Sequence, residues 1–307
     1  MRHSFAFAAM MLALSGCAGR SSAPPGARPN SPPSGAGAKE GWSLKEVSVL
    51  EGLRTPECVV VDPATGCPYL SNIDTDKEGF WEDDGTGFIS KLKPGGAMDE
   101  LKWRESKPEQ KLNAPKGMCI LDGVLYVTDN SRMVAFPLSK EAENKAIQNL
   151  HSGKKLNDLA GDGKAVWVSD TAEGKIHRCA AEGIREIKSP KGINGLAFHK
   201  ERMFGVSWDL HEVYELDPAG KEEPKPFGLA AEFKNLDGIE ALEDGSLLVT
   251  DFPGNKVVLI SPDRKTTRVL ATPESPADLG IDRERGLVFV PLFMKNRMIV
   301  YKLERGK

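Results

Sequence analysis

Six short apolar runs in the sequence follow one pattern, and the residue that leads each run suggests a cation site. The runs read ECVVVD, KGMCIL, NDLAGD, NGLAFH, DGIEAL and ADLGID. Two of the six leading residues are carboxylates and two are amides, so four of them carry a side-chain oxygen. If the fold gathers these positions, they form an oxygen-rich site for a metal ion. The six leading residues are Glu57, Lys116, Asn157, Asn194, Asp237 and Ala277.

This donor set is typical of a hard cation. Ca²⁺ takes about six to eight oxygen ligands and tolerates irregular geometry. Two carboxylates balance its charge, the amides add neutral ligands, and water would complete the shell. Mg²⁺ or another divalent ion would also fit, whereas the lack of His and Cys at these positions argues against zinc or copper. The alternative is that each Asn or Asp is only a turn residue at a strand entrance.

The elements that must position these residues are the strands of a repeat. A second strand follows each run, and these second strands end in YLSN, YVTD, WVSD, GVSW, LVTD and FVPL. The leading residues are 59, 41, 37, 43 and 40 positions apart. A period near 40 residues with about four strands in each unit is typical of a β-propeller. The first strand of each blade lines the central tunnel, so the leading residues should form a ring at one mouth.

The ends of the repeat indicate how the propeller closes. The last unit stops after its third strand, MIVYKL, and lacks an outer strand. Residues 44–50, LKEVSVL, precede the first inner strand and can supply it. The sequence therefore predicts an all-β fold, a six-bladed β-propeller over residues 41–307, closed by an N-terminal strand in the last blade. Two packed β-sandwiches are the alternative, but they would not explain why the six leading residues recur at equivalent positions of the repeat.

The segments PECVVVD, LNDLAGD, INGLAF and LDGIEAL resemble the senescence-marker-protein/gluconolactonase family, whose members include regucalcin-like proteins. The resemblance covers about residues 44 to 304. It implies a six-bladed propeller with a divalent cation, usually calcium, at the tunnel mouth. By position, it implies the metal ligands Glu57, Asn157, Asn194 and Asp237. The chain departs from the family pattern where Cys58 follows the first ligand, and where Lys116 and Ala277 supply no oxygen.

From these residues we expect a calcium-dependent hydrolase of a lactone or related ester, acting on a small-molecule substrate. The cation would polarise the carbonyl and activate water. Asp237 is the expected catalytic residue, as ligand and as general base or nucleophile, and Glu57 the expected pure ligand. Lys116 and Trp208 are expected to contact substrate. The alternative is a non-catalytic propeller that senses a ligand or serves as an interaction scaffold, with a structural calcium.

An acidic insertion, residues 72–87, follows the second strand of the first unit. Asp74, Asp76, Glu78 and Gly79 begin like an EF-hand loop, but Gly85 stands where the twelfth position requires Glu. A rim loop over the mouth is the preferred interpretation, and a second calcium site the alternative.

The N-terminus predicts export. Residues 1–16 resemble a lipoprotein signal peptide, and Leu14-Ser15-Gly16-Cys17 resembles a lipobox, which implies lipidation of Cys17. Residues 17–40 are rich in Pro, Gly, Ser and Ala and predict a disordered tether. We expect a monomer at the periplasmic face of the cell envelope, an outer-membrane lipoprotein that meets the membrane only through this lipid anchor.

Bulk properties limit the partners and the redox chemistry. The formal net charge is −3 at pH 7, so there is no basic field for nucleic acid. On a hairpin, Cys58 would face position 71 rather than Cys67, which puts the two cysteines too far apart for a disulfide. We interpret the four cysteines after Cys17 as buried thiols.

Overall fold

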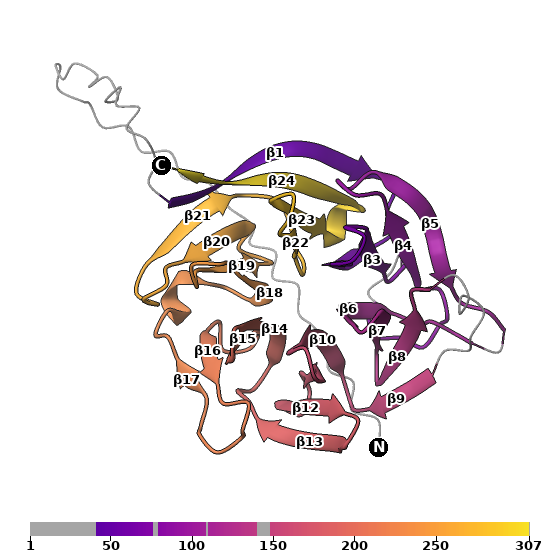
Figure 1. Cartoon of the computed structure of the whole chain (residues 1–307), viewed down its shortest axis with the longest axis horizontal. Helices are drawn as coiled ribbons and strands as arrows, with labels where there is room; N and C mark the ends of the chain where they lie inside the picture. The colour runs from indigo at the N-terminus through magenta and orange to yellow at the C-terminus, as the bar shows by residue number, and fades with distance from the viewer. Residues whose placement is uncertain (1–40, 76–78, 109, 140–147, 307) are drawn as a thin grey trace, which may run out of the picture. The chain divides into compact units, whose positions relative to one another are not determined.

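The computed structural model describes residues 41–75, 79–108, 110–139 and 148–306 of the chain. These residues form six four-stranded antiparallel sheets, which are arranged as blades around a central tunnel (Figure 1). The six-bladed propeller is confirmed, and the two-sandwich alternative is wrong. The predicted signal peptide, Cys17 and the tether lie outside the described residues. Within the described ranges, no helix is long and apolar enough to cross a membrane.

The first three blades take their strands in chain order, from the tunnel outward. Blade 1 consists of β2 (Pro56–Val61), β3 (Pro68–Asn72), β4 (Phe88–Leu92) and β5 (Met98–Glu105). Blade 2 consists of β6 (Pro115–Leu121), β7 (Val124–Asp129), β8 (Arg132–Pro137) and β9 (Gln148–Ser152). Blade 3 consists of β10 (Leu156–Gly161), β11 (Val166–Asp170), β12 (Lys175–Ala180) and β13 (Gly183–Lys188).

The next two blades repeat this order, and the last one borrows a strand. Blade 4 consists of β14 (Ile193–His199), β15 (Arg202–Ser207), β16 (Val213–Leu216) and β17 (Lys225–Pro226). Blade 5 consists of β18 (Leu236–Ala241), β19 (Leu247–Asp251), β20 (Lys256–Ile260) and β21 (Thr267–Ala271). Blade 6 consists of β22 (Gly280–Asp282), β23 (Leu287–Leu292), β24 (Arg297–Gly306) and β1 (Gly41–Glu51).

The ring closes through the two ends of the folded chain, as the sequence predicts. β1 pairs antiparallel with β24, in a register that runs from Gly41 opposite Gly306 to Glu51 opposite Arg297. Without β1, β24 would present unpaired backbone groups at an open edge. The pairing leaves each of the six sheets with four strands.

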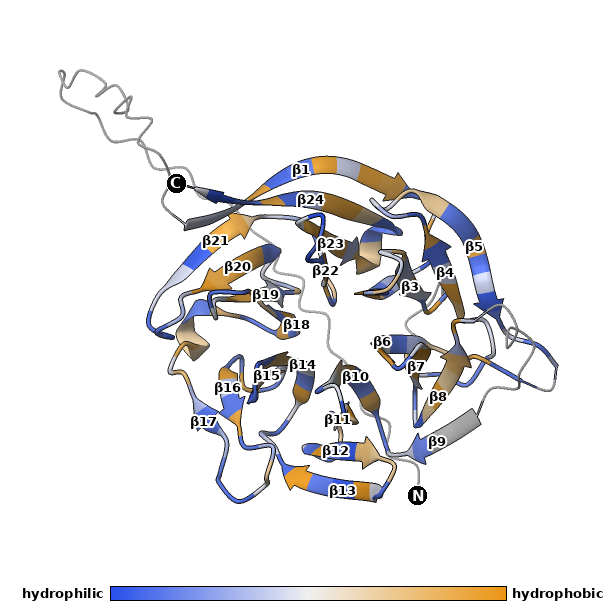
Figure 2. Cartoon of the chain, in the orientation of Figure 1, coloured by the Kyte–Doolittle hydropathy of each residue, from blue (hydrophilic) through white to orange (hydrophobic). Residues whose placement is uncertain are grey.

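Apolar side chains fill the layers between neighbouring blades. The second strands β3, β11 and β19 are buried along their whole length, because each is covered by a blade on both faces. This explains their nearly continuous apolar sequences. The outer strands face water, and β5 is largely hydrophilic in Figure 2.

Five inner strands carry an irregularity at the same place. The register shifts between Pro56 and Val59 in β2, and at the matching positions of β6, β10, β14 and β18. Three steps along the inner strand match two along its partner, which defines a β-bulge. The predicted metal ligands Glu57, Asn157, Asn194 and Asp237 are each the first residue of such a bulge.

The Ser/Thr-Asp column of the second strands supports these bulges. Ser71, Ser169 and Thr250 each accept a hydrogen bond from a bulge amide, at 2.9, 2.9 and 2.8 Å. The next residue, an Asp or Asn, holds the loop that leads into the inner strand. Asp129 Oδ1, for example, accepts the amides of Asn113 and Ala114 at 2.8 and 2.7 Å. The Ser/Thr-Asp pairs at the ends of the second strands therefore serve to hold the backbone.

Deleting β1 tests the closure. A chain that starts at Gly52 loses ten paired positions with β24, and each net hydrogen bond contributes about 1 kcal/mol. We expect its melting temperature to fall by at least about 10 °C, with association through the freed edge. A chain that starts at Gly41 is the control and should keep the native transition. Thermal circular dichroism and size-exclusion chromatography measure both, and equal stability of the two chains would contradict the closure.

Candidate functional site

The four predicted ligands come together at one mouth of the tunnel. The inner strands that carry them surround its axis (Figure 1), and the four side chains are only 4–8% exposed. Asn194 Nδ2 donates to Asp237 Oδ1 at 2.7 Å across neighbouring blades. Burial raises the pKa of Glu57, and the negative charge of the Asp237 carboxylate nearby adds to this rise. Residues separated by up to 180 positions in the sequence thus share one small site.

Two atoms of this oxygen ring have no partner among the described residues. Glu57 Oε2 and Asn157 Oδ1 are buried and accept no hydrogen bond from them. A buried acceptor without a donor is uncommon in a native protein, and an ion or water usually accounts for it. Both atoms are hard oxygen donors, so the ring fits a divalent cation such as Ca²⁺.

Burial favours the protonated form of the ring carboxyls, Glu57 and Asp237. It raises the pKa of Asp237 to about 7, although the hydrogen bond from Asn194 acts in the opposite direction. Burial also raises the pKa of Glu57 well above its usual range, the Asp237 carboxylate adds to the rise, and Lys116 opposes it. Two carboxylates that repel each other in a buried site would both ionise most easily around a cation.

Lys116 lies in the ring position of blade 2, but its ammonium contacts the rim. Nζ donates to Ala114 O at 2.9 Å and to Asn130 Oδ1 at 3.1 Å. It also lies 3.9 Å from the centre of the Trp81 ring. Burial lowers the pKa of Lys116 to about 8. The lysine is 3% exposed, enclosed beneath Trp81.

The acidic insertion supplies that cover. Asp83 Oδ1 accepts hydrogen bonds from Asn113 Nδ2 at 3.0 Å and from Asn130 Nδ2 at 2.9 Å, which fixes the loop to blade 2. Asp74 is paired with Arg54 at 2.7 Å. The other two acidic residues of the EF-hand-like start, at positions 76 and 78, lie outside the described residues. The described part thus has the position expected of a rim loop.

A second set of equivalent positions lies directly after the second strands. In five blades, the amide of this residue donates to the carbonyl two residues before the ring position, as Phe252 does to Asn235 at 3.0 Å. Trp208 belongs to this set. The sequence alignment put Trp208 in the Asp column, but Ser207 pairs with Ile193 and takes that place. That alignment was therefore wrong by one residue. The six residues are Ile73, Asn130, Thr171, Trp208, Phe252 and Phe293.

This second set makes the mouth one-sided. Blades 2 and 3 present Asn130 and Thr171, whereas blades 4 to 6 present aromatic rings. Successive ring centres are 5.7 Å apart from Trp208 to Phe252, 5.5 Å from Phe252 to Phe293, and 4.9 Å from Phe293 to Phe80 of the insertion. We call these four residues the aromatic arc. It borders the side of the ring where Ala277 offers no ligand.

A deeper acidic cluster was missed in the sequence. The ligand atoms of Cys58, Asp158 and Asp278 all lie within 4.8 Å of one another, and all three residues are buried. Burial raises the pKa of Asp158 to about 7 and that of Asp278 well above its usual range. Asp278 directly follows Ala277, and although blade 6 adds no ligand to the ring, the Asp278 carboxyl reaches this deeper cluster. All three directly follow ring positions, which was the available signal.

The interpretation of the four described cysteines as free thiols is confirmed, but only two of them are fully buried. All four are free, with Cys58 and Cys119 buried and Cys67 and Cys179 partly buried. The amide of Cys58 donates to Ser71 Oγ, so this residue does face position 71.

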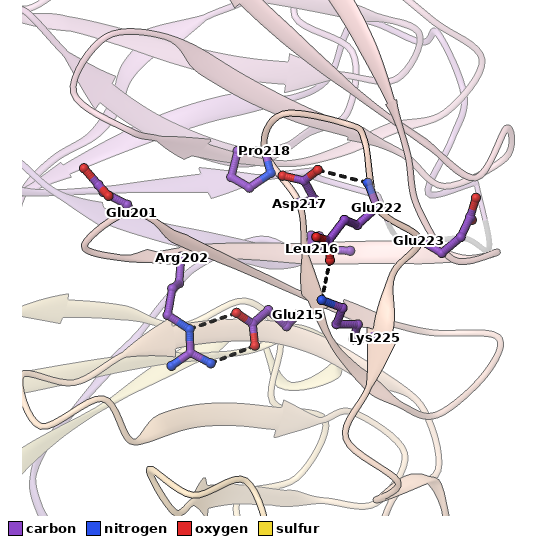
Figure 3. A pocket seen from close by; sticks show the side chains of 9 residues that line it. All are labelled: Glu201, Arg202, Glu215, Leu216, Asp217, Pro218, Glu222, Glu223 and Lys225. Atoms are coloured by element: carbon purple, nitrogen blue, oxygen red, sulfur yellow. Dashed lines mark hydrogen bonds and ion pairs between the residues drawn. The ribbon is translucent and has the colours of Figure 1, made fainter.

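A surface pocket also lies in blade 4, away from the ring (Figure 3). Its charged groups largely satisfy one another. Arg202 makes two hydrogen bonds to Glu215, at 2.9 and 2.7 Å, and Lys225 pairs with Glu222. The pocket thus lacks the buried, unpartnered oxygens of the mouth.

The fold and the ring together define a six-bladed β-propeller with oxygen donors at its tunnel mouth. Among solved structures, the chain is similar to a protein proposed to be a gluconolactonase, with a TM-score of 0.62 and 17% identity over 89% of this chain and 94% of that one. It is also similar to virginiamycin B lyase from Staphylococcus aureus, with a TM-score of 0.54 and 13% identity over 86% of this chain and 100% of that one. At these identities the likeness shows the fold alone. Neither a protein-family profile nor a curated protein sequence matches the chain.

The raised carboxyl pKa values predict how pH acts on the site. A carboxyl whose pKa is raised by folding stabilises the fold at low pH, and that contribution is lost as pH rises toward the folded value, about 7 for Asp237. The metal-free protein should therefore lose stability between about pH 4 and 7. Ca²⁺ must displace the proton, so its affinity should rise up to about tenfold per pH unit across this range. Calorimetric titration with proton-release measurement tests this, and pH-independent binding would contradict it.

Proposed function

We propose that this chain is a calcium-dependent hydrolase of a lactone or related ester, with its active site at the tunnel mouth. The observation that carries the proposal is the buried oxygen ring, in which Glu57 Oε2 and Asn157 Oδ1 have no hydrogen-bond partner among the described residues. Glu57, Asn157, Asn194 and Asp237 would hold the ion. A bound Ca²⁺ would polarise the substrate carbonyl and lower the pKa of water.

Asp237 is the residue best suited to move a proton. Its carboxylate is oriented by the hydrogen bond from Asn194 Nδ2. A bound cation would hold this carboxylate ionised, which is the form that a general base or nucleophile needs. We assign it the removal of a proton from the attacking water, or direct attack on the carbonyl. Glu57, whose pKa is also raised by burial, serves as a ligand.

The one-sided mouth suggests how a substrate lies. The aromatic arc offers an apolar surface against which an acyl or aryl substituent can pack. Trp208, at one end of the arc, contacts that substituent. Lys116 acts from beneath Trp81, where its positive charge offsets part of the negative charge of the ring.

A second candidate is a non-catalytic sensor or scaffold with a structural calcium. The low exposure of the four ring side chains, 4–8%, favours it, because a substrate must reach the ion. In either case we propose a monomer carried at the periplasmic face of the envelope, through lipidation of Cys17 and the tether of residues 17–40.

Turnover tests separate the two. Wild type loaded with Ca²⁺ should hydrolyse at least one of three substrate classes: aldonolactones, aryl esters and acyl-homoserine lactones. Asp237→Asn should lower kcat by about 100-fold or more at saturating Ca²⁺, while Asp263→Asn, on an exposed turn, should not. Mass spectrometry should find a lactone product that is heavier than its substrate by one water, because hydrolysis adds water. Ring opening by elimination would leave the mass unchanged. Calcium binding without turnover on every class would favour the scaffold, and no divalent binding would refute the site.

The aromatic arc can be tested on its own. Phe252→Ala should raise KM for an acyl-substituted lactone by about 5- to 30-fold, because it removes apolar contact worth ~1–2 kcal/mol. KM for the unsubstituted ring and kcat should change little. Val269→Ala, an exposed apolar residue on the outer strand of the same blade, is the matched control. An equal effect on both lactones would show that the arc does not bind the substituent.

A further inference from the structure

Two histidines meet between blades 2 and 3, on outer parts of the blades. His151 belongs to β9, the outer strand of blade 2, and His177 to β12, the third strand of blade 3. Their ring centres are 4.4 Å apart, with the planes tilted by 53°. His177 is 3% exposed. The pair thus lies where blades 2 and 3 pack against each other.

Three of the four ring nitrogens in this pair are buried without a hydrogen-bond partner among the described residues. They are Nδ1 and Nε2 of His177 and Nε2 of His151. An imidazole in a protein interior normally uses at least one nitrogen, since unpaired polar atoms are costly there. One ion between the two rings would account for two of these atoms, His151 Nε2 and one nitrogen of His177.

A carboxylate stands beside them. Glu186 of β13 is the direct cross-strand neighbour of His177. Its Oε1 lies 3.7 Å from His177 Nδ1, and its Oε2 pairs with Lys175 at 3.0 Å. A separation of 3.7 Å is too long for a hydrogen bond. It is near the roughly 3.3 Å that separates two ligands on one tetrahedral Zn²⁺ with bonds of about 2.0–2.1 Å.

The charges around the pair favour neutral imidazoles, the form that binds metals. Burial lowers the pKa of both histidines, and His177 lowers that of His151 further. Asp170 and Glu186 oppose the shift at both rings, and Lys175 adds to it at His177. Both rings therefore offer lone pairs at neutral pH.

We propose that a borderline transition-metal ion such as Zn²⁺ binds between blades 2 and 3, with His151, His177 and Glu186 as ligands and water in the fourth position. Closure onto the ion requires rotation of Glu186, whose side chain is 53% exposed. Two imidazoles and one carboxylate suit zinc, whereas the all-oxygen ring suits calcium. The bound ion would join the two blades, and this site does not depend on the activity proposed for the mouth.

The test is a Zn²⁺ titration of the full chain in saturating Ca²⁺, which occupies the mouth. Calorimetry should find one Zn²⁺ per chain, with a higher melting temperature in Zn²⁺. His151→Ala and His177→Ala should each weaken binding by at least about 100-fold, since even outer-shell partners cost 10- to 100-fold. His199 is a partly exposed histidine in blade 4, and the His199→Ala variant should bind Zn²⁺ like wild type. Zinc binding that is absent, or unchanged in both variants, would overturn the site.

A second measurement covers the case in which His177→Ala does not fold. Nuclear magnetic resonance of the wild-type imidazole protons should show His151 and His177 shifting together on Zn²⁺ addition, while His199 stays in place. Glu186→Gln, an exposed change that leaves both rings intact, should weaken binding by about tenfold or more. Movement of His199 alone would assign the zinc to the surface and reject the proposal.

Discussion

The bulge at the start of five inner strands is the constraint on which the site depends. A regular strand turns successive side chains to opposite faces, so only one of two neighbours would reach the tunnel. The extra residue breaks this alternation, and both Asn157 and Asp158 are buried near the axis. Hydroxyl groups such as that of Ser169 accept a hydrogen bond from the displaced amide, so the bulge forms without leaving that amide unpaired. Ring and deeper cluster are two products of one backbone feature.

Neighbouring inner strands approach each other so closely in the deeper layer that some positions there must be glycine. A Cβ at Gly238 would lie 2.3 Å from Asp278 Oδ1, and one at Gly195 would lie 2.5 Å from the carbonyl oxygen of Asp237. These glycines are therefore needed by contact with the next blade, even though they stand within strands. The Asn-Gly and Asp-Gly pairs of the sequence resemble turns, but here they combine a tunnel ligand with a contact surface.

The sequence was sufficient for most of what repeats along the chain, although Trp208 was aligned one residue out of register. The period, the closing strand and the ring column follow from hydrophobic pattern and alignment, and no other knowledge is needed. It was insufficient where blades differ or meet. β22 begins only at Gly280, so Ala277 and Asp278 precede the strand and the role of Asp278 was hidden. The contact of Lys116 with Trp81 depends on an insertion outside the repeat. His151 and His177 belong to different blades, and only packing between sheets reveals their contact.

The pairing of Gly41 with Gly306 has a topological consequence. The two ends of the folded chain lie side by side at the rim of blade 6 (Figure 1), so all six blades are complete four-stranded sheets although the covalent chain is open. The order of the blades is therefore cyclic, and the position of the chain break is a matter of connectivity rather than of packing. A circular permutant, with these ends joined and a new opening in another outer loop, would retain every strand pair and the whole oxygen ring.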